Sequence, residues 1–202
     1  KRHTQESQRE MTMKTIGAFV IGMSIMTIQA ATGIAQPTIY IVRHAEALEP
    51  WPGDSLADYK PLNSEGVARS QKLAERFSPG SLTAIYTSLT TRTIQTAHPL
   101  AQKLGLSIKI ADACMDTAAV ETFYGELEAQ YGDEDVILLV THSNIIPELL
   151  MAAALPPECY VRMGFVKSPH YPGWLIEGYD NLWKIQWRSR DNACKGIEKT
   201  RF

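Results

Sequence analysis

Short apolar segments alternate with longer amphipathic segments along most of this chain. Residues 136–140 are uninterrupted apolar residues, which is typical of a strand buried on both faces of a parallel sheet. The segments that we interpret as strands are residues 38–42, 82–88, 106–111 and 136–140. The segments with helical spacing are residues 63–77, 91–104, 117–131 and a helix that begins near residue 145. This order predicts an α/β fold, a three-layer α/β/α sandwich with a mostly parallel central sheet.

Three segments interrupt the alternation. Residues 46–61 contain three prolines and one glycine, so we expect a long loop there. Pro99 lies inside the second predicted helix, where it predicts a kink or a break. Residues 173–189 alternate in polarity and predict two strands around a turn at residues 179–181.

The first 35 residues have a different pattern. Lys14 is followed by a nearly continuous apolar run, and small residues precede Ala35. These features predict a signal peptide that is cleaved after Ala35 or after Ala31, with an N-terminal membrane anchor as the alternative. In both cases we expect residues 36–202 to form a single exported domain, periplasmic or secreted. A membrane is a partner only if the leader stays uncleaved.

The chain has three cysteines, Cys114, Cys159 and Cys194. In an oxidising compartment two of them could pair, and the pair Cys159–Cys194 is slightly favoured. Their spacing matches no metal-binding motif, and we expect no metal site.

The composition narrows the class of protein. The formal net charge is −2, with 45% hydrophobic and 21% charged residues. This balance is typical of a folded domain and lacks the basic excess of nucleic-acid-binding proteins, so we expect no nucleic-acid partner. An anionic substrate would need a local positive site, because the chain as a whole does not attract it.

Polar side chains follow three of the predicted strands at their carboxyl ends. Arg43 and His44 follow the first strand, residues 88–92 follow the second, and residues 141–144 follow the strand at 136–140. Ligands of open α/β sheets bind outside these carboxyl ends, so the three segments can converge on one site.

Two arginines and two histidines at such a site would suit a phosphate monoester. Arginines hold phosphate oxygens bidentately, and a neutral imidazole can attack phosphorus to form a phosphohistidine. A second histidine would stabilise charge in the transition state, and an acid would protonate the leaving alkoxide. Each histidine taken alone is more commonly a structural residue, so the hypothesis depends on the whole set.

Four stretches, in sequence order, resemble the motifs of the histidine phosphatase superfamily, the phosphoglycerate-mutase-like group. They are "IVRHAEA" (41–47), "PLNSEGVARSQKLAERF" (61–77), "YTSLTTRTIQTA" (86–97) and "LLVTHSNII" (138–146). Ala45 stands where glycine is common in the family, and Pro50 stands near a missing asparagine. The chain is identified as a member of the compact, exported branch.

The resemblance implies a role for each matching residue. His44 would accept the phosphoryl group, and Arg43, Arg92 and His142 would bind it. Glu46 lies beside them and is counted among the substrate-binding residues, with a solvated loop carboxylate as the alternative. Thr93 also lies beside them.

The residue after the second histidine also bears on the branch of the family. Phytase-like members carry an aspartate there, whereas this chain has Ser143, which we count with the substrate-binding residues. The resemblance therefore disfavours the phytase-like branch.

The resemblance leaves the proton donor open. Many members place a glutamate at the position that lies eleven residues beyond Gly105, which here is Asp116. Glu121 and Asp112 are close alternatives, and a site without a dedicated acid is another.

The resemblance implies a hydrolase rather than a mutase. Mutases of the superfamily need a sizeable lid between the second helix and the second histidine, and only residues 97–141 separate Thr96 from His142. We therefore expect a phosphomonoesterase of the histidine acid type, which acts through a phosphohistidine on a small phosphate such as a sugar phosphate. No cofactor or metal is implied, because arginines supply the positive charge.

Three alternative functions stay open at this point. They are a phosphatase of heptose phosphate in the lipopolysaccharide core, a phosphohistidine-protein phosphatase and a non-catalytic phosphate-binding module. Trp51, Tyr171 and Trp174 could stack on a sugar, although ordinary packing is the commoner role of such aromatics. The sequence carries no signal for the oligomeric state.

Overall fold

A computed structural model describes residues 36–49, 59–170, 172–186, 194 and 196–202. The predicted leader, Trp51 and Tyr171 lie outside these residues, as does Pro50. Among the residues described, no helix combines the length and the apolar character needed to cross a membrane.

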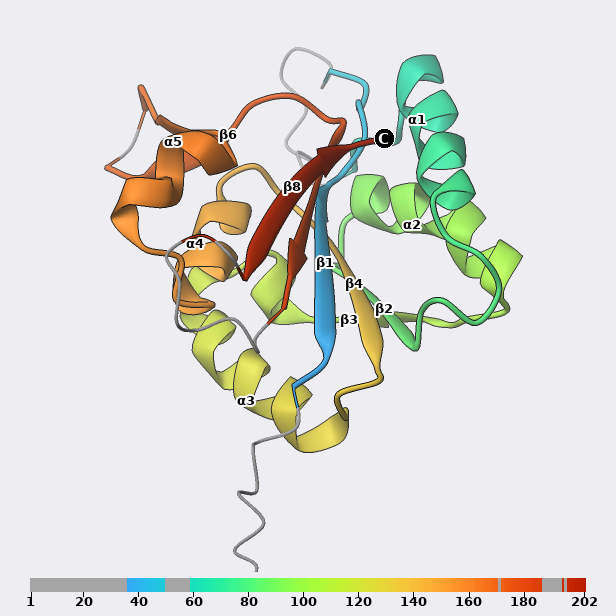
Figure 1. The fold of residues 1–202 in the computed structure, drawn as a ribbon. Helices are drawn as coiled ribbons and strands as arrows, with labels where there is room; N and C mark the ends of the chain where they lie inside the picture. Colours follow the sequence, from blue (N-terminus) through green and yellow to red (C-terminus); the bar gives the residue numbers. More distant parts are fainter. Residues whose placement is uncertain (1–35, 50–58, 171, 187–193, 195) are drawn as a thin grey trace, which may run out of the picture. The chain divides into compact units, whose positions relative to one another are not determined.

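Six strands form the central sheet, most of which are labelled in Figure 1. They are β1 (Thr38–Arg43), β2 (Ala84–Thr87), β3 (Ile108–Ile110), β4 (Val136–Thr141), β7 (Asn181–Ile185) and β8 (Ile197–Arg201). Their order is β3-β2-β4-β1-β7-β8. The pairs among β1 to β4 are parallel, whereas β7 is antiparallel to both β1 and β8. The predicted α/β fold is confirmed, and the sheet is mixed.

Helices cover both faces of this sheet. They are α1 (Ser64–Glu75), α2 (Thr91–Leu104), α3 (Val120–Gln130), α4 (Ile145–Ala152), the short α5 (Tyr160–Met163) and the 3-10 turns η1 (Asp112–Cys114), η2 (Thr117–Ala119) and η3 (Pro157–Cys159). Figure 1 shows α1 and α2 on one side of the sheet and α3 and α4 on the other.

Alternation along the strands divides the apolar residues between two cores. On β1, Ile39 and Ile41 join the core under α3 and α4, while Val42 joins the core under α1 and α2. On β4, Leu139 and Leu138 divide in the same way. Successive side chains of a strand point to opposite faces of the sheet. Because helices cover both faces, these strands are apolar at every position.

Of the kink or break predicted at Pro99, the break is wrong, because α2 continues from Thr91 to Leu104 with Pro99 inside it. Proline lacks the N–H that would bond to the carbonyl four residues earlier. Leu100 and Ala101, directly beyond Pro99, are buried in the core with α1. Ala97, before Pro99, is buried in the same core, so packing on both sides of the proline compensates for the missing bond. The helix ends at Gly105 in the left-handed conformation.

The strands expected in residues 173–189 are present, but they do not pair with each other. The first is β6 (Trp174–Ile176), which pairs with β5 (Phe165–Lys167) in a separate two-stranded sheet. The second is β7, which enters the central sheet between β1 and β8. Polarity alternation predicts a strand but does not select its partner, because the partner depends on long-range packing.

Cys159 and Cys194 form a disulfide, which is the pairing that the sequence slightly favoured. The bond joins the end of η3 to a segment just before β8. Cys114 is free and buried.

Candidate active site

The parallel pairing of β1 and β4 brings the two predicted histidines together. Arg43 at the end of β1 is opposite Thr141 at the end of β4, and the His44 N–H donates to the Thr141 carbonyl at 2.8 Å. The rings of His44 and His142 are 5.2 Å apart between centroids and meet edge to face. They are only 8% and 7% exposed, so the site lies at the carboxyl edge of the sheet but out of bulk water.

The backbone fixes the tautomer of His44. Its Nδ1 lies 2.8 Å from the carbonyl oxygen of Ala45. A carbonyl only accepts hydrogen bonds, so Nδ1 carries the proton and Nε2 of the neutral ring keeps its lone pair. Burial, with the nearby charges of Arg43 and Arg92, lowers the pKa of His44 to about 4. The ring is therefore neutral near pH 7.

His142 has the opposite tautomer. Arg92 Nη2 donates to His142 Nδ1 at 3.3 Å, and an arginine never accepts, so Nδ1 is unprotonated. The Nε2–H then donates to Ser88 Oγ at 2.9 Å. Burial first, and then the charge of Arg92, lower the pKa of His142 to about 3.

A cluster of buried hydroxyls supports Ser88 beneath His142. Ser88 Oγ lies within 3.1 Å of Thr90 Oγ1 and within 2.9 Å of Thr93 Oγ1. These residues form the turn from β2 into the first turn of α2, which also carries Arg92. The cluster holds both Ser88 and Arg92 in place against His142. Thr93 therefore supports the residues that contact His142.

The side chain of Arg43 is held by the segment that precedes β7. Its Nη1 donates to the Gly178 carbonyl at 3.3 Å, and its Nη2 donates to the Tyr179 hydroxyl at 3.2 Å. The guanidinium carbon lies 3.9 Å from the centre of the Tyr179 ring. The Tyr179 ring is also 5.9 Å from that of His44. No pattern in the sequence marks Tyr179 as part of the site, because its position depends on β7 lying beside β1.

Helix α2 anchors the loop that follows His44. The Ala45 N–H donates to Thr96 Oγ1 at 2.9 Å, and the Thr96 hydroxyl donates to the Arg92 carbonyl at 2.7 Å. Gln95 Oε1 accepts the Leu62 N–H at 2.8 Å, farther along the same loop. The motif residues Gln95 and Thr96 thus position the backbone at the two ends of this loop, at Leu62 and Ala45 respectively.

Glu46 is engaged in an ion pair with α1. Both of its carboxylate oxygens accept from Arg69 Nε at 2.8 Å. Its side chain is only 12% exposed, so the solvated alternative is wrong. Burial raises the pKa of Glu46, but the hydrogen bonds from Arg69 outweigh it and the pKa is lowered overall. An ionised, occupied carboxylate is poorly suited to hold a phosphate anion, and its role as a substrate-binding residue stays a prediction.

Ser143 is half-buried, and its carbonyl accepts the Ile176 N–H at 2.9 Å. This bond ties the turn after His142 to β6. Ser143 is therefore next to the site in sequence, and contact of its hydroxyl with substrate stays a prediction.

The three candidate proton donors are Asp112 at the start of η1, Asp116 at the N-cap of η2, and Glu121 in the first turn of α3. The Thr141 hydroxyl donates to the Cys114 carbonyl at 2.6 Å, which holds the segment leading to Asp116 against the end of β4. Asp116 is exposed, and its Oδ1 accepts the Ala118 N–H at 2.9 Å. Glu121 is exposed in the first turn of α3. Asp112 and Asp116 are each two residues from the anchored Cys114, so this bond does not distinguish them, and the assignment of the acid stays a prediction.

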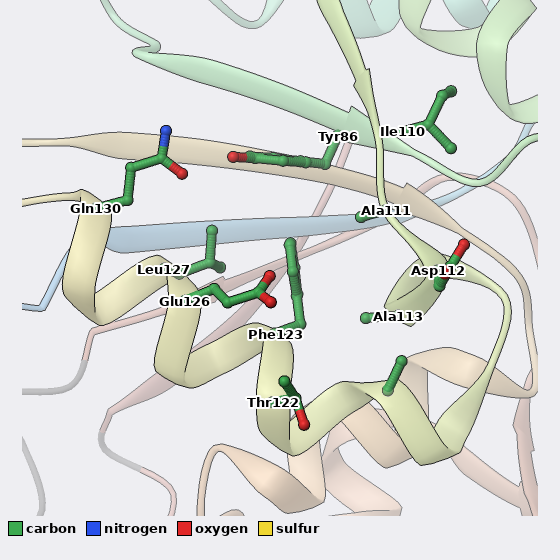
Figure 2. A pocket seen from close by; sticks show the side chains of 11 residues that line it. Tyr86, Ile110, Ala111, Asp112, Ala113, Thr122, Phe123, Glu126, Leu127 and Gln130 are labelled. Atoms are coloured by element: carbon green, nitrogen blue, oxygen red, sulfur yellow. The ribbon is translucent and has the colours of Figure 1, made fainter.

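The remaining candidate, Asp112, lines a cavity that is separate from the histidine pair. This cavity has a volume of about 550 Å³ and lies between α3 and the β2–β3 edge of the sheet. Its lining side chains are drawn in Figure 2. Tyr86, Phe123 and Glu126 also line it. None of the residues predicted to bind the phosphoryl group lines this cavity.

Two other features of the described residues concern metal-ligating clusters and the surroundings of Trp174. No group of three or more His, Cys, Asp or Glu side chains there is arranged to hold a metal ion. Trp174 packs edge to face on Tyr160 at 5.5 Å, and Lys167 Nζ lies 3.7 Å from its ring centre. Trp174 is thus part of the packing around β6, and its stacking on a sugar stays a prediction.

Two comparisons with known proteins concern the sequence. The family model of the histidine phosphatase superfamily (branch 1) matches residues 39–122, which include Arg43, His44 and Arg92. No curated protein matches the chain.

Several solved structures share the fold. A candidate phosphohistidine phosphatase SixA from Agrobacterium tumefaciens is 22% identical, with 74% of this chain and 91% of that chain covered and a TM-score of 0.52. A mycobacterial glucosyl-3-phosphoglycerate phosphatase is 16% identical, with coverage of 82% and 96% and a TM-score of 0.55. The protein histidine phosphatase SixA complexed with tungstate is 16% identical, with coverage of 82% and 94% and a TM-score of 0.51. At these identities the likeness concerns the fold.

Proposed function

We propose that this chain is a phosphomonoesterase of the histidine phosphatase superfamily, whose family model matches residues 39–122, and that His44 accepts the phosphoryl group. The observation that carries the proposal is the bond from His44 Nδ1–H to the Ala45 carbonyl. This bond leaves Nε2 as the only ring nitrogen with a lone pair, in a ring that is neutral at physiological pH.

The four clustered side chains would divide the first step between them. Arg43 and Arg92 bind the phosphoryl oxygens, while Nε2 of His44 attacks phosphorus and the bond to the leaving oxygen breaks. His142 donates its Nε2–H to Ser88 and accepts from Arg92 at Nδ1, so it would act by holding Arg92 against the phosphoryl oxygens as charge spreads over them in the transition state. The departing alkoxide takes a proton, which we assign to Asp116.

A water molecule would complete the reaction. The water oxygen attacks the phosphorus of phosphohistidine as the P–N bond to Nε2 breaks. One proton of the water passes to Asp116, which became a carboxylate when it gave its own proton to the leaving group in the first step, and the other stays on the phosphate. The products are inorganic phosphate and the original neutral His44. The Ala45 carbonyl holds Nδ1–H throughout, so the ring returns to the tautomer from which it began.

We assign to this enzyme a small phosphomonoester as substrate, with sugar phosphates among the first candidates. The neighbours in the fold include a phosphatase named for a sugar-linked substrate and another named for protein histidine. We further propose an exported location, periplasmic or secreted. The pattern of residues 1–35 supports this, as does the Cys159–Cys194 disulfide, which is typical of an oxidising compartment.

The test is turnover of a chromogenic aryl phosphate by wild type, His44→Ala and His98→Ala. The aryl leaving group needs little protonation, so the assay does not depend on the identity of the acid. We expect activity in wild type and in His98→Ala, since His98 is exposed on α2, and none in His44→Ala. Mass spectrometry of rapidly denatured wild type should find phosphate on His44. If no turnover and no phosphorylated His44 are found, the chain is a phosphate-binding module instead.

A screen of wild type over sugar phosphates, nucleotides, phosphoserine peptides and phosphohistidine peptides would then identify the substrate class. A preference for phosphohistidine peptides of more than about 100-fold in kcat/KM, or roughly 3 kcal/mol, would replace the sugar phosphate assignment.

A further inference from the structure

Tyr179 contacts the proposed phosphate-binding arginine in two ways. Its ring lies under the guanidinium group of Arg43, 3.9 Å from the guanidinium carbon. Its hydroxyl oxygen accepts from Arg43 Nη2 at 3.2 Å. A stacked ring and a hydrogen bond together fix both the plane and the rotation of a planar cation.

These contacts occupy one edge of the guanidinium group. Gly178 and Tyr179 accept from Nη1 and Nη2, so the edge formed by these two nitrogens faces the segment before β7. Arg43 Nε is buried and has no hydrogen-bond partner among the described residues. The edge formed by Nε and Nη2 is therefore the one left for a second bidentate partner, since Nη2 carries two hydrogens.

The same edge of another arginine shows the geometry in this protein. Arg69 binds the Glu46 carboxylate through Nε and Nη2, with Nε 2.8 Å from each oxygen. Phosphate oxygens accept in the same fork geometry as a carboxylate.

We propose that Tyr179 is a positioning residue that holds Arg43 so that its Nε–Nη2 edge faces the phosphoryl oxygens. This inference rests on the proposed function, because it assumes that phosphate binds at Arg43. A long arginine side chain loses considerable conformational freedom when it binds, and Tyr179 removes that freedom before substrate arrives. Tyr179 thus acts through Arg43 on the binding of the phosphoryl group.

The test uses two substitutions that separate the contacts. Tyr179→Phe keeps the ring and removes the hydroxyl, and Tyr179→Leu removes both. We expect the Kd for inorganic phosphate, measured by calorimetry, to rise about 3- to 10-fold for Tyr179→Phe and more for Tyr179→Leu. KM for an aryl phosphate should rise in parallel. Tyr40→Phe is the control, since Tyr40 is half-buried on β1 and packs on Phe77.

A double-mutant cycle distinguishes positioning from a general loss of structure. Arg43→Lys cannot present a fork, so Tyr179→Leu should weaken phosphate binding little further in that background. Equal effects of Tyr179→Leu with Arg43 and with Arg43→Lys would overturn the inference, as would wild-type phosphate affinity in Tyr179→Leu. Calorimetry needs no turnover, so these outcomes are separate from failure of the proposed function, in which wild type binds phosphate but hydrolyses nothing.

Discussion

Arg69 of α1 holds the carboxylate of Glu46 through both Nε and Nη2. Glu46 is two residues after His44, the proposed nucleophile. The loop after β1 is thus joined to a helix that contributes no residue to the proposed chemistry. Both side chains are mostly buried, with 19% and 12% exposed, so the pair is screened less than a surface ion pair.

We predict that Arg69→Ala lowers the free energy of unfolding by about 1–3 kcal/mol, because it leaves the buried Glu46 carboxylate without its partner. Denaturant unfolding measures this directly. Glu65→Gln is the control: its exposed carboxylate also accepts from Arg69, at 3.3 Å, and its loss should change stability by less than about 0.5 kcal/mol. Equal effects of both variants would contradict a special role for Glu46.

Gly66 allows α1 to approach the same loop. A Cβ on Gly66 would overlap the Glu46 carbonyl oxygen, which is backbone and cannot turn aside. We predict that Gly66→Ala destabilises the fold by about 2 kcal/mol or more and lowers activity, although alanine is the better helix former. Chemical denaturation and the aryl phosphate assay measure the two effects.

Gly125→Ala is the matched control for this prediction. Gly125 also lies in a helix, α3, but a Cβ there would meet nothing within 4 Å. Without a clash, the substitution should stabilise the protein by up to about 1 kcal/mol. A stabilising Gly66→Ala would show that α1 does not need this close approach.

The depressed pKa values of the two histidines predict a loss of stability in acid. Between the ordinary pKa of 6.5 and the folded value of about 4, His44 binds a proton in the unfolded chain but not in the folded protein. The stability is therefore complete above pH 6.5 and falls as the pH drops toward 4. His142, with a folded pKa of about 3, acts in the same direction.

Urea unfolding of wild type and His44→Asn at several pH values from 7 to 4.5 tests this sign. The variant lacks the buried imidazole of His44, so its free energy of unfolding should fall less steeply with pH than that of wild type. The difference between the two slopes should be up to about 1.4 kcal/mol per pH unit. Parallel curves for the two proteins would mean that His44 is not buried as a neutral ring.

Asp116→Asn should separate substrates by their leaving groups. If Asp116 protonates the leaving oxygen, kcat/KM should fall about 100-fold or more for alkyl phosphates and much less for aryl phosphates, whose leaving groups need little protonation. Asp112→Asn and Glu121→Gln, assayed in parallel, should leave this ratio unchanged. If one of these two variants produces the selective loss instead, that residue is the acid.

The disulfide should contribute to stability by restricting the unfolded chain. Cys159 and Cys194 are 35 residues apart, and a loop of this size corresponds to about 2–4 kcal/mol. We expect dithiothreitol to lower the midpoint of denaturant unfolding of wild type. The double variant Cys159→Ser and Cys194→Ser should start lower and not respond to the reductant.

Local patterns of the sequence predicted much of the fold. Strands β1, β2 and β4 and helices α1 and α2 lie where apolar spacing placed them, because burial on two faces or along one stripe leaves a periodic signal. Pro99 did not break α2, and β6 did not pair with β7. In both cases packing from elsewhere in the chain decided the outcome over the local preference.

The sequence by itself determined which side chains stand at the strand ends, and therefore that Arg43, His44, Arg92 and His142 could meet. Only the tertiary structure decided that Tyr179 lies under Arg43 and that Glu46 belongs to Arg69. Each of these contacts joins segments that are far apart in the chain, and their meeting depends on which strands pair. Strand pairing is set by the packing of the whole core, for which no single stretch of sequence carries a signal.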